Sequence, residues 1–294
     1  MTPNPLAKMR RLAAALHDLR TSHGYNHAEL SRKSGISASV ISRIENPVND
    51  LRRANLLSVR RLLDALEVPR NSQEWAAIES YTEDASAARW WDAAPYSRMG
   101  DGQRISALIE AGAASVWDYA GLLLPGVVQT AAYARHRILA VAGDNPAADP
   151  EPIVAGRLER QRRVVTEGST EYTLVLEEQA IRRHPVPAPV MREQLEHLLS
   201  LIGDGVSIRV VPVDAHLDDG FAPRAPFAHV SYPDPLDPPI VGVDNAAVRV
   251  SLVTDPVEVT AYAQLHLRLL RAALSDADSA ALIREVSSSL ATTI

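Results

Sequence analysis

Apolar residues near the start of the chain recur every three or four positions, the period of a helix that buries one face. The period runs through residues 12–19 and 56–66, and between them through a shorter stretch, 26–45, which reads NHAELSRKSGISASVISRIE. Gly35 divides this stretch into two segments, and glycine turns a chain sharply at little steric cost. The pattern predicts a helical bundle containing a helix-turn-helix, with its second helix at residues 37–45.

Polar residues mark the starts of both short helices. Asn26 is placed to cap the first helix, with Glu29 three residues later in a capping-box arrangement, and Ser37 is placed to cap the second. Ser31 supplies a small side chain inside the first helix, where the two helices must approach each other. The sequence therefore predicts where each helix begins.

Beyond residue 105 the pattern changes to short runs of apolar and β-branched residues that alternate with helical periods. Strands are predicted at residues 114–120, 171–177, 206–213, 227–232, 239–244 and 248–253. Helices are predicted at residues 130–142, 151–165, 190–203 and 256–274, and another follows the N-cap candidate Ser275. The predicted fold class is an N-terminal all-α helix-turn-helix bundle followed by an α+β domain.

The length of 294 residues exceeds that of one typical domain and fits a division into three parts. We predict a helix-turn-helix domain at residues 1–70, a connecting helical segment at 71–105 and an α+β domain at 106–294. The connecting segment and its approach carry four aromatic residues that are candidates for a dimer contact or for cementing the two domains of one chain. These residues are Trp75, Tyr81, Trp90 and Trp91.

Charge is distributed unevenly between these parts. The first 70 residues hold 12 basic and six acidic side chains, a net charge of +6, whereas the whole chain carries −6. A basic segment beside an acidic remainder is typical of a chain that meets nucleic acid with one part only, because phosphate charge must be offset. The asymmetry therefore indicates nucleic acid as the partner of the first part and something else as the partner of the second.

Composition excludes several classes of site. The chain has no cysteine, so disulfides and thiolate metal sites are excluded. No run of about 18 apolar residues and no basic-then-apolar leader is present, so we expect neither a membrane span nor export. The predicted location is the cytoplasm, with no membrane partner.

The N-terminal stretch resembles the lambda-repressor-like, xenobiotic-response-element type of DNA-binding domain over roughly residues 8–69. The resemblance rests on Gly24, His27, Glu29, Leu30, Ser31, Gly35, Ile44 and Glu45. It implies a homodimer bound to double-stranded DNA through the helix at residues 37–45, and an ion pair between Arg20 and Glu45. Two residues depart from the pattern, since similar domains often hold glutamine where this chain has His27 and Ala38.

That departure shifts the expected base contacts, because Ala38 is limited to an apolar edge such as a thymine methyl group. We expect direct base contacts mainly from Ser39, Ser42 and Arg43. The expected DNA-contacting set, including the residues placed for phosphate, is His27, Lys33, Ser37, Ala38, Ser39, Ser42, Arg43, Asn46, Arg52 and Arg53.

A second resemblance covers most of residues 105–285. The segments that carry it are LLLPGVVQTAAYAR, RLERQ, LEEQAIRR, EQL, and IRVVPV followed by a loop and APF. They look like the C-terminal domain of WhiJ-related, antitoxin-like actinobacterial transcriptional regulators. The resemblance implies a domain that senses a small-molecule ligand or a protein partner. In the alternative hypothesis the domain is an antitoxin-like interaction module that binds a small companion protein, with DNA binding serving autoregulation.

Four residues of this second domain are candidates for contact with a ligand or partner: Gln129, Arg157, Arg160 and Gln161. The last three lie on one helical face, where the arginines are spaced to clamp a carboxylate or phosphate. They are equally spaced to form internal ion pairs with Glu177 and Glu178, and the acidity of the domain favours this second interpretation. Gln129 follows a Pro125–Gly126 bend whose role is better explained by structure than by ligand contact.

An enzyme fused to a DNA-binding domain is the least favoured class. No GxSxG, HExxH, phosphate-binding glycine loop or dinucleotide fingerprint occurs in the chain. His216, Asp218 and Asp219 lie in one loop that reads as solvated rather than metal-binding, and single histidines beside apolar residues are expected to pack or to form hydrogen bonds. Those histidines are His184, His229 and His266. We predict no catalytic residue, no metal and no cofactor.

Overall fold

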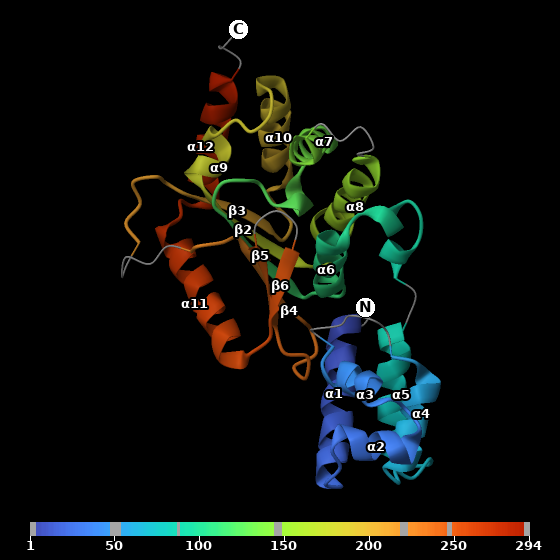
Figure 1. Ribbon diagram of the computed structural model, residues 1–294. Helices are drawn as coiled ribbons and strands as arrows, with labels where there is room; N and C mark the ends of the chain where they lie inside the picture. The colour runs from blue at the N-terminus through green and yellow to red at the C-terminus, as the bar shows by residue number, and fades with distance from the viewer. Residues whose placement is uncertain are drawn as a thin grey trace. The chain divides into compact units, whose positions relative to one another are not determined.

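A computed structural model describes residues 4–47, 54–86, 89–143, 149–217, 223–245 and 249–290. The chain divides into two compact units, Met1–Arg89 with Asp234–Pro238, and Trp90–Pro233 with Pro239–Ile294. The first unit is helical and the second contains a mixed sheet flanked by helices (Figure 1). This arrangement confirms the predicted fold class.

The described residues of the first unit form a bundle of five helices. They are α1 (Pro5–Ser22), α2 (His27–Ser34), α3 (Ala38–Glu45), α4 (Leu56–Ala65) and α5 (Gln73–Ser86). Asparagine or serine caps the first four helices, because a side-chain oxygen there accepts hydrogen bonds from backbone N–H groups that have no partner within the helix. The predicted capping box at Asn26 and the predicted cap at Ser37 are both confirmed.

The apolar stripes of these helices meet in one core, which explains why short helices are stable here. Leu16 of α1, Leu30 of α2, Ile41 of α3 and Leu63 of α4 are at most 2% exposed. Trp75 of α5 joins the same core and is 6% exposed. Trp75 is therefore not available as a contact for a second copy of the chain, which removes it from the first of the two predicted alternatives. Trp91, at 3% exposed, is buried as well.

The second unit contains a six-stranded sheet with the order β3-β2-β1-β4-β5-β6. The strands are β1 (Ser115–Ala120), β2 (Glu171–Glu177), β3 (Val206–Val211), β4 (Phe227–Ser231), β5 (Ile240–Asn245) and β6 (Arg249–Val253). β1, β2 and β3 run parallel, whereas β4, β5 and β6 add antiparallel neighbours. Every predicted strand is present, with small differences at the ends.

Helices cover both faces of this sheet (Figure 1). On one face lie α6 (Asp101–Glu110), α7 (Ala131–Ala142), α8 (Glu151–Gln161) and α10 (Ala188–Leu201); α11 (Pro256–Ala272) covers the other face. The remaining helical elements are α9 (Glu178–Arg182), α12 (Asp276–Ser289), the 3-10 turns η1 (Trp90–Asp92), η2 (Tyr96–Arg98) and η3 (Gly126–Val128), and the π-helical turn η4 (Arg162–Thr166). The helix predicted at residues 151–165 thus ends at Gln161 and continues as a π-turn. None of the described helices is long and apolar enough to cross a membrane.

Candidate nucleic-acid interface

The end of α3 is fixed by a buried carboxylate. The side chain of Glu45 is 3% exposed and accepts two hydrogen bonds from Arg20, at 2.8 Å from Nε and 2.7 Å from Nη2. Nδ1 of His17 and Nε2 of His27 lie 3.2 and 3.1 Å from the same carboxylate. Arg20 also donates to the carbonyl of Tyr25 at 2.8 Å. The predicted Arg20–Glu45 pair is confirmed, and it ties α1, α2 and α3 together.

The electrostatics of Glu45 reflect this network. Burial acts to raise the pKa of the Glu45 carboxyl, but the hydrogen bonds from Arg20, His27 and His17 outweigh burial and lower the pKa below its ordinary value. His27, predicted to lie near phosphate, is therefore held against Glu45 and is about one-third exposed. The angle between α2 and α3 therefore depends on this network of buried charges as well as on apolar packing.

The turn between α2 and α3 depends on Gly35. Gly35 has φ 70° in the left-handed region, where a side chain is strained, and its N–H closes the C-terminal end of α2 by donating to the carbonyl of Ser31. A Cβ atom added at Gly35 would lie 2.6 Å from Nη2 of Arg61 in α4. The glycine therefore allows the turn and lets the Arg61 guanidinium lie beside it.

The outward face of α3 is small and polar. Ile41 and Ile44 point into the core and are buried, which leaves the other side of the helix facing solvent. That side carries the exposed Ser37 and Ser39 and the half-buried Ala38, Ser42 and Arg43, followed by the exposed Asn46. Nδ2 of Asn46 donates to the carbonyl of Ser42 at 2.7 Å. The predicted base-contacting residues thus share one surface, and Arg43 is its one cation.

Some cations of the first unit contact other side chains of the protein, whereas others are available for phosphate. Lys33, predicted to contact phosphate, donates to Glu67 at 2.9 Å and to the hydroxyl of Tyr25 at 3.0 Å. Among the described residues of this unit, no ion pair is formed by Arg32 of α2, Arg43 of α3 or Arg61 of α4. These three guanidinium groups come from the three elements that build the helix-turn-helix and its flank.

Arg32 and Arg61 were not in the predicted DNA-contacting set. The exposed position of Arg32 on α2 is readable from the helical period, so the sequence did contain a signal for it. The position of Arg61 beside Gly35 depends on how α4 packs, which no local pattern specifies. Arg52 and Arg53, both predicted to contact phosphate, lie outside the described residues.

The four candidate ligand residues of the second unit lie in one polar cluster, in which Arg157 is half-buried and the other three are buried. Arg160 donates to both carboxylate oxygens of Glu110, at 2.8 and 2.5 Å, and to Oε1 of Gln103 at 3.0 Å. Nη1 of Arg157 donates to Oε1 of Gln129, and Nε2 of Gln161 donates to the carbonyl of Val127 at 2.9 Å. An internal ion pair is therefore present at Arg160, whereas Arg157 meets a neutral amide.

The predicted partners of that ion pair were wrong. Glu177 accepts a hydrogen bond from the hydroxyl of Tyr119 at 3.0 Å, and Glu178 pairs with Arg182 on its own helix, α9. Arg160 instead pairs with Glu110 at the end of α6. Tertiary packing places α6 beside α8 on the same face of the sheet. Charge alone predicted that Arg160 would pair with a carboxylate, but not with which carboxylate.

Two of the single histidines pack as predicted. The rings of His229 and His266 each stack on Trp117 with centroids 5.1 Å apart, and His266 is fully buried. Burial lowers the pKa of both imidazoles, that of His266 to about 4. His184 is exposed instead of packed, because it follows the end of α9.

No group of three or more metal-ligating side chains occurs among the described residues, and Asp218 and Asp219 of the predicted solvated loop lie outside them.

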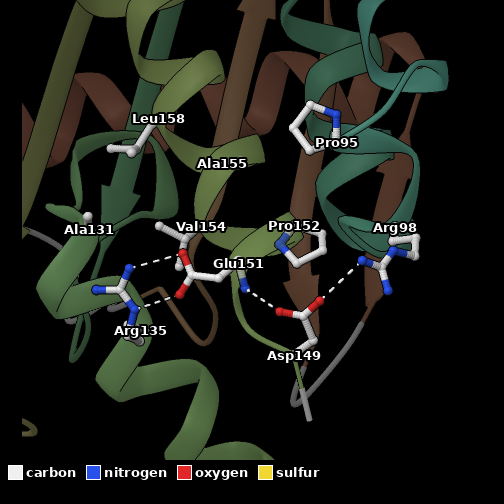
Figure 2. Close-up of a pocket in the computed structure, with 10 residues that line it drawn as sticks. All are labelled: Pro95, Arg98, Ala131, Arg135, Asp149, Glu151, Pro152, Val154, Ala155 and Leu158. Atoms are coloured by element: carbon white, nitrogen blue, oxygen red, sulfur yellow. Dashed lines mark hydrogen bonds and ion pairs between the residues drawn. The ribbon is translucent and has the colours of Figure 1, made fainter. Parts of the chain in front are cut away.

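A surface groove of about 330 Å³ lies between η2, α7 and the start of α8. Arg98 pairs with Asp149 at 3.1 Å and Arg135 pairs with Glu151 at 2.7 Å. Both pairs lie along this groove (Figure 2). All four side chains are more than one-third exposed, and each charge is offset by its neighbour. The groove therefore presents no uncompensated charge to a ligand, in contrast to the buried cluster around Arg157.

Comparisons with known proteins identify both units. The sequence profile of a helix-turn-helix family matches residues 16–71, and that of a domain of unknown function, DUF5753, matches residues 104–285. No curated protein and no solved structure gives a significant match. The helix-turn-helix match covers the surface formed by α2, α3 and α4.

Proposed function

The chain belongs to the DUF5753 family, and we propose that it is a sequence-specific transcriptional regulator whose C-terminal domain senses a small ligand or a protein partner. The helix-turn-helix domain marks it as a DNA-binding regulator. The observation that best supports sequence-specific recognition is the outward face of α3, where small polar side chains surround Arg43 on a helix anchored from behind by Glu45.

The proposed division of labour follows from side-chain chemistry. Arg43 has the fork geometry that reads guanine in the major groove, and Ser39 and Ser42 are short enough for the helix to approach base edges closely. Arg32 and Arg61 flank this helix and are free to bind phosphate, which positions the protein without reading sequence. The acidic second unit then acts as the regulatory part of a cytoplasmic protein.

We propose that the active form is a homodimer. One short recognition helix contacts only a few base pairs, whereas two related by a two-fold axis read half-sites about one helical turn apart. Doubling the contacts raises specific affinity into the range at which a regulator finds its site among competing sequences.

The test is selection of binding sites from a random DNA library with the full chain. We expect enrichment of an inverted repeat whose half-sites are separated by about 10 base pairs, or a multiple of that distance. A variant with Arg43→Ala, Ser39→Ala and Ser42→Ala should retain salt-sensitive binding but enrich no sequence. The exposed Arg284 of α12 offers a control, since Arg284→Ala should enrich the same site as the wild type. Failure of the wild-type chain to enrich any sequence would refute the proposed function.

A further inference from the structure

In the second unit, the order in which strands are added to the sheet reverses direction at β1. β2 and β3 lie on one side of β1, whereas β4, β5 and β6 lie on the other. β5 is antiparallel to β4, which is antiparallel to β1, so β1 and β5 end at the same edge of the sheet. In open α/β sheets, ligands bind beyond the carboxyl ends of parallel strands, and β1 and β5 both end here with the antiparallel β4 between them. The topology thus singles out the edge that follows Ala120 and Asn245.

Charged side chains gather near this edge on the face covered by α6 and α8. Asp118 of β1 aligns with Ala228, which aligns with Gly242 of β5, and Asp244 follows two residues later on the same face. Gly242 lies against Ile109, which identifies this as the α6 face. The elements above it contribute the Arg160–Glu110 pair and Arg157.

Asp118 is held in this cluster by the hydroxyl of Tyr172, which donates to Oδ2 at 3.0 Å. Burial, with the charges of Glu110 and Asp244, raises the pKa of Asp118 to about 7 against the opposing effects of the Tyr172 hydrogen bond and Arg160. A carboxyl group with a pKa near neutral carries less than a full negative charge there, so it only partly offsets the cationic groups of the cluster.

Arg157 has one carboxylate nearby, that of Asp244, but no carboxylate in direct contact among the described residues. Its side chain is half-buried, forms no ion pair with any described residue and donates one hydrogen bond, to the neutral Gln129. Burial and the charges of Arg160 and Arg137 together lower the pKa of Arg157 to about 10, and the charges of Tyr133 and Asp244 oppose this change. A partly desolvated cation with no carboxylate in direct contact favours an anion beside it.

The chain after β1 holds Arg157 in place. A Cβ atom added at Gly126 would lie 3.4 Å from Nε of Arg157 and 3.6 Å from Nη1 of Arg160, so the backbone of this bend runs directly against both guanidinium groups. Gln129, which receives the hydrogen bond from Arg157, is itself fixed because its Nε2 donates to the carbonyl of Leu124 at 2.7 Å. The guanidinium is therefore oriented before any ligand arrives.

We propose that Arg157 anchors an oxyanion-binding site, where the carboxylate or phosphate group of a small-molecule effector forms paired hydrogen bonds with its guanidinium. The charge of Asp244 near Arg157 disfavours polyanions, which restricts the ligand to one carrying a single compact anionic group. The regulatory role of this site rests on the proposed sensing function of the C-terminal domain. Anion binding itself is measured without DNA.

The experiment titrates the full chain with potassium phosphate and, separately, potassium acetate at constant ionic strength, by calorimetry at 25 °C. We expect saturable binding with one anion site per chain for at least one of the two salts, and the responding salt identifies the ligand group as phosphate or carboxylate. Arg157→Gln should weaken this binding at least about tenfold, as expected for loss of a charged hydrogen bond. Arg157→Lys keeps the charge but loses the fork, and should also bind more weakly.

Two controls make the result decisive. Arg284→Gln removes an exposed arginine of the same unit and should leave the titration unchanged. Arg43→Ala tests whether phosphate binds the DNA-contacting surface instead. Circular dichroism checks that each variant is folded, and if Arg157→Gln unfolds, the comparison rests on Arg157→Lys.

The proposal is overturned if neither salt binds saturably, if both Arg157 variants bind like the wild type, or if only Arg43→Ala abolishes binding. A chain that binds the anion but selects no DNA sequence would refute the proposed function and leave this site standing. A chain that selects DNA but binds no anion would refute this site and leave the proposed function standing.

Discussion

Glu45 shows how one residue controls the geometry of the recognition helix. Its carboxylate is almost fully enclosed, and Arg20 satisfies it with two hydrogen bonds. We expect Arg20→Met to lower the free energy of unfolding by about 3 kcal/mol, because the buried carboxylate would lose its permanent cation and keep only its contacts with His17 and His27. Urea denaturation followed by circular dichroism measures the change.

The matched control for this prediction is the double variant Arg20→Met with Glu45→Gln. Removing both charges leaves no stranded ion, so the double variant should be more stable than the sum of the two single changes predicts. Additive effects would contradict a direct interaction between the two side chains.

Arg43 and Arg32 are expected to differ in what they recognise. Arg43→Ala should cost about 1–3 kcal/mol of specific DNA binding and relax discrimination between sequences, because a base contact is lost. Arg32→Ala should weaken binding to all sequences alike and reduce the salt dependence, because a phosphate contact is lost. Competition assays with specific and random DNA separate the two effects. Equal weakening of specific and random binding by Arg43→Ala would remove Arg43 from base recognition.

The buried histidines predict a dependence of stability on pH. The pKa of His266 falls from its ordinary 6.5 to about 4 in the folded chain, so the unfolded chain takes up protons first as the pH drops. The neutral His266 should therefore contribute about 3 kcal/mol to the free energy of unfolding. This contribution is complete above pH 6.5, declines below it and is lost by about pH 4. His266→Phe keeps a ring against Trp117 and should be free of this decline.

Asp118 titrates with the opposite sign, since its raised pKa favours the folded chain at low pH. The measurement therefore compares His266→Phe with the wild type by urea denaturation at each pH between 7.5 and 5. The Asp118 contribution is common to both proteins and cancels. A difference between them that stays constant with pH would show that His266 does not titrate in this range.

At the scale of elements, the α2–α3 turn is the most constrained connection. Gly24 and Gly35 have nearly equal φ angles, 71° and 70°, but a Cβ atom meets nothing within 4 Å at Gly24 and meets Arg61 at Gly35. Alanine at either position should cost about 1–2 kcal/mol of stability from the left-handed backbone alone. Gly35→Ala should additionally displace Arg61 and weaken DNA binding, whereas Gly24→Ala should not.

Stability and DNA affinity of the two glycine variants are measured side by side. If both variants bind DNA equally well after correction for the folded fraction, the position of Arg61 beside the turn has no role in binding. If Gly35→Ala loses affinity at every sequence tested, Arg61 acts on phosphate, as its exposed position beside the turn suggests.

At the scale of the whole molecule, two-fold symmetry is the central prediction. Sedimentation of the full chain at micromolar concentration should give a homodimer, because two half-sites require two recognition helices. The buried Trp75 is not available for this contact, so the interface must use other surface. A monomer that gives a two-half-site footprint only by assembling on DNA would contradict a preformed dimer.

The sequence by itself determined the features that depend on neighbours along the chain. Helical periods, the caps at Asn26 and Ser37, and all six strands were predicted because local hydrogen bonding and the burial of one face leave a regular pattern. The charge asymmetry between the two parts of the chain is also a property of sequence alone.

The tertiary structure decided which distant groups meet. The sequence indicated that Arg160 would find a carboxylate, but packing of α6 selected Glu110 instead of Glu177 or Glu178. In the same way, packing paired Lys33 with Glu67, placed Arg61 beside Gly35 and left Arg157 facing a neutral amide. These outcomes depend on contacts between residues far apart in sequence, where burial removes competing water and many charges of the right sign are available, so only the folded geometry chooses among them.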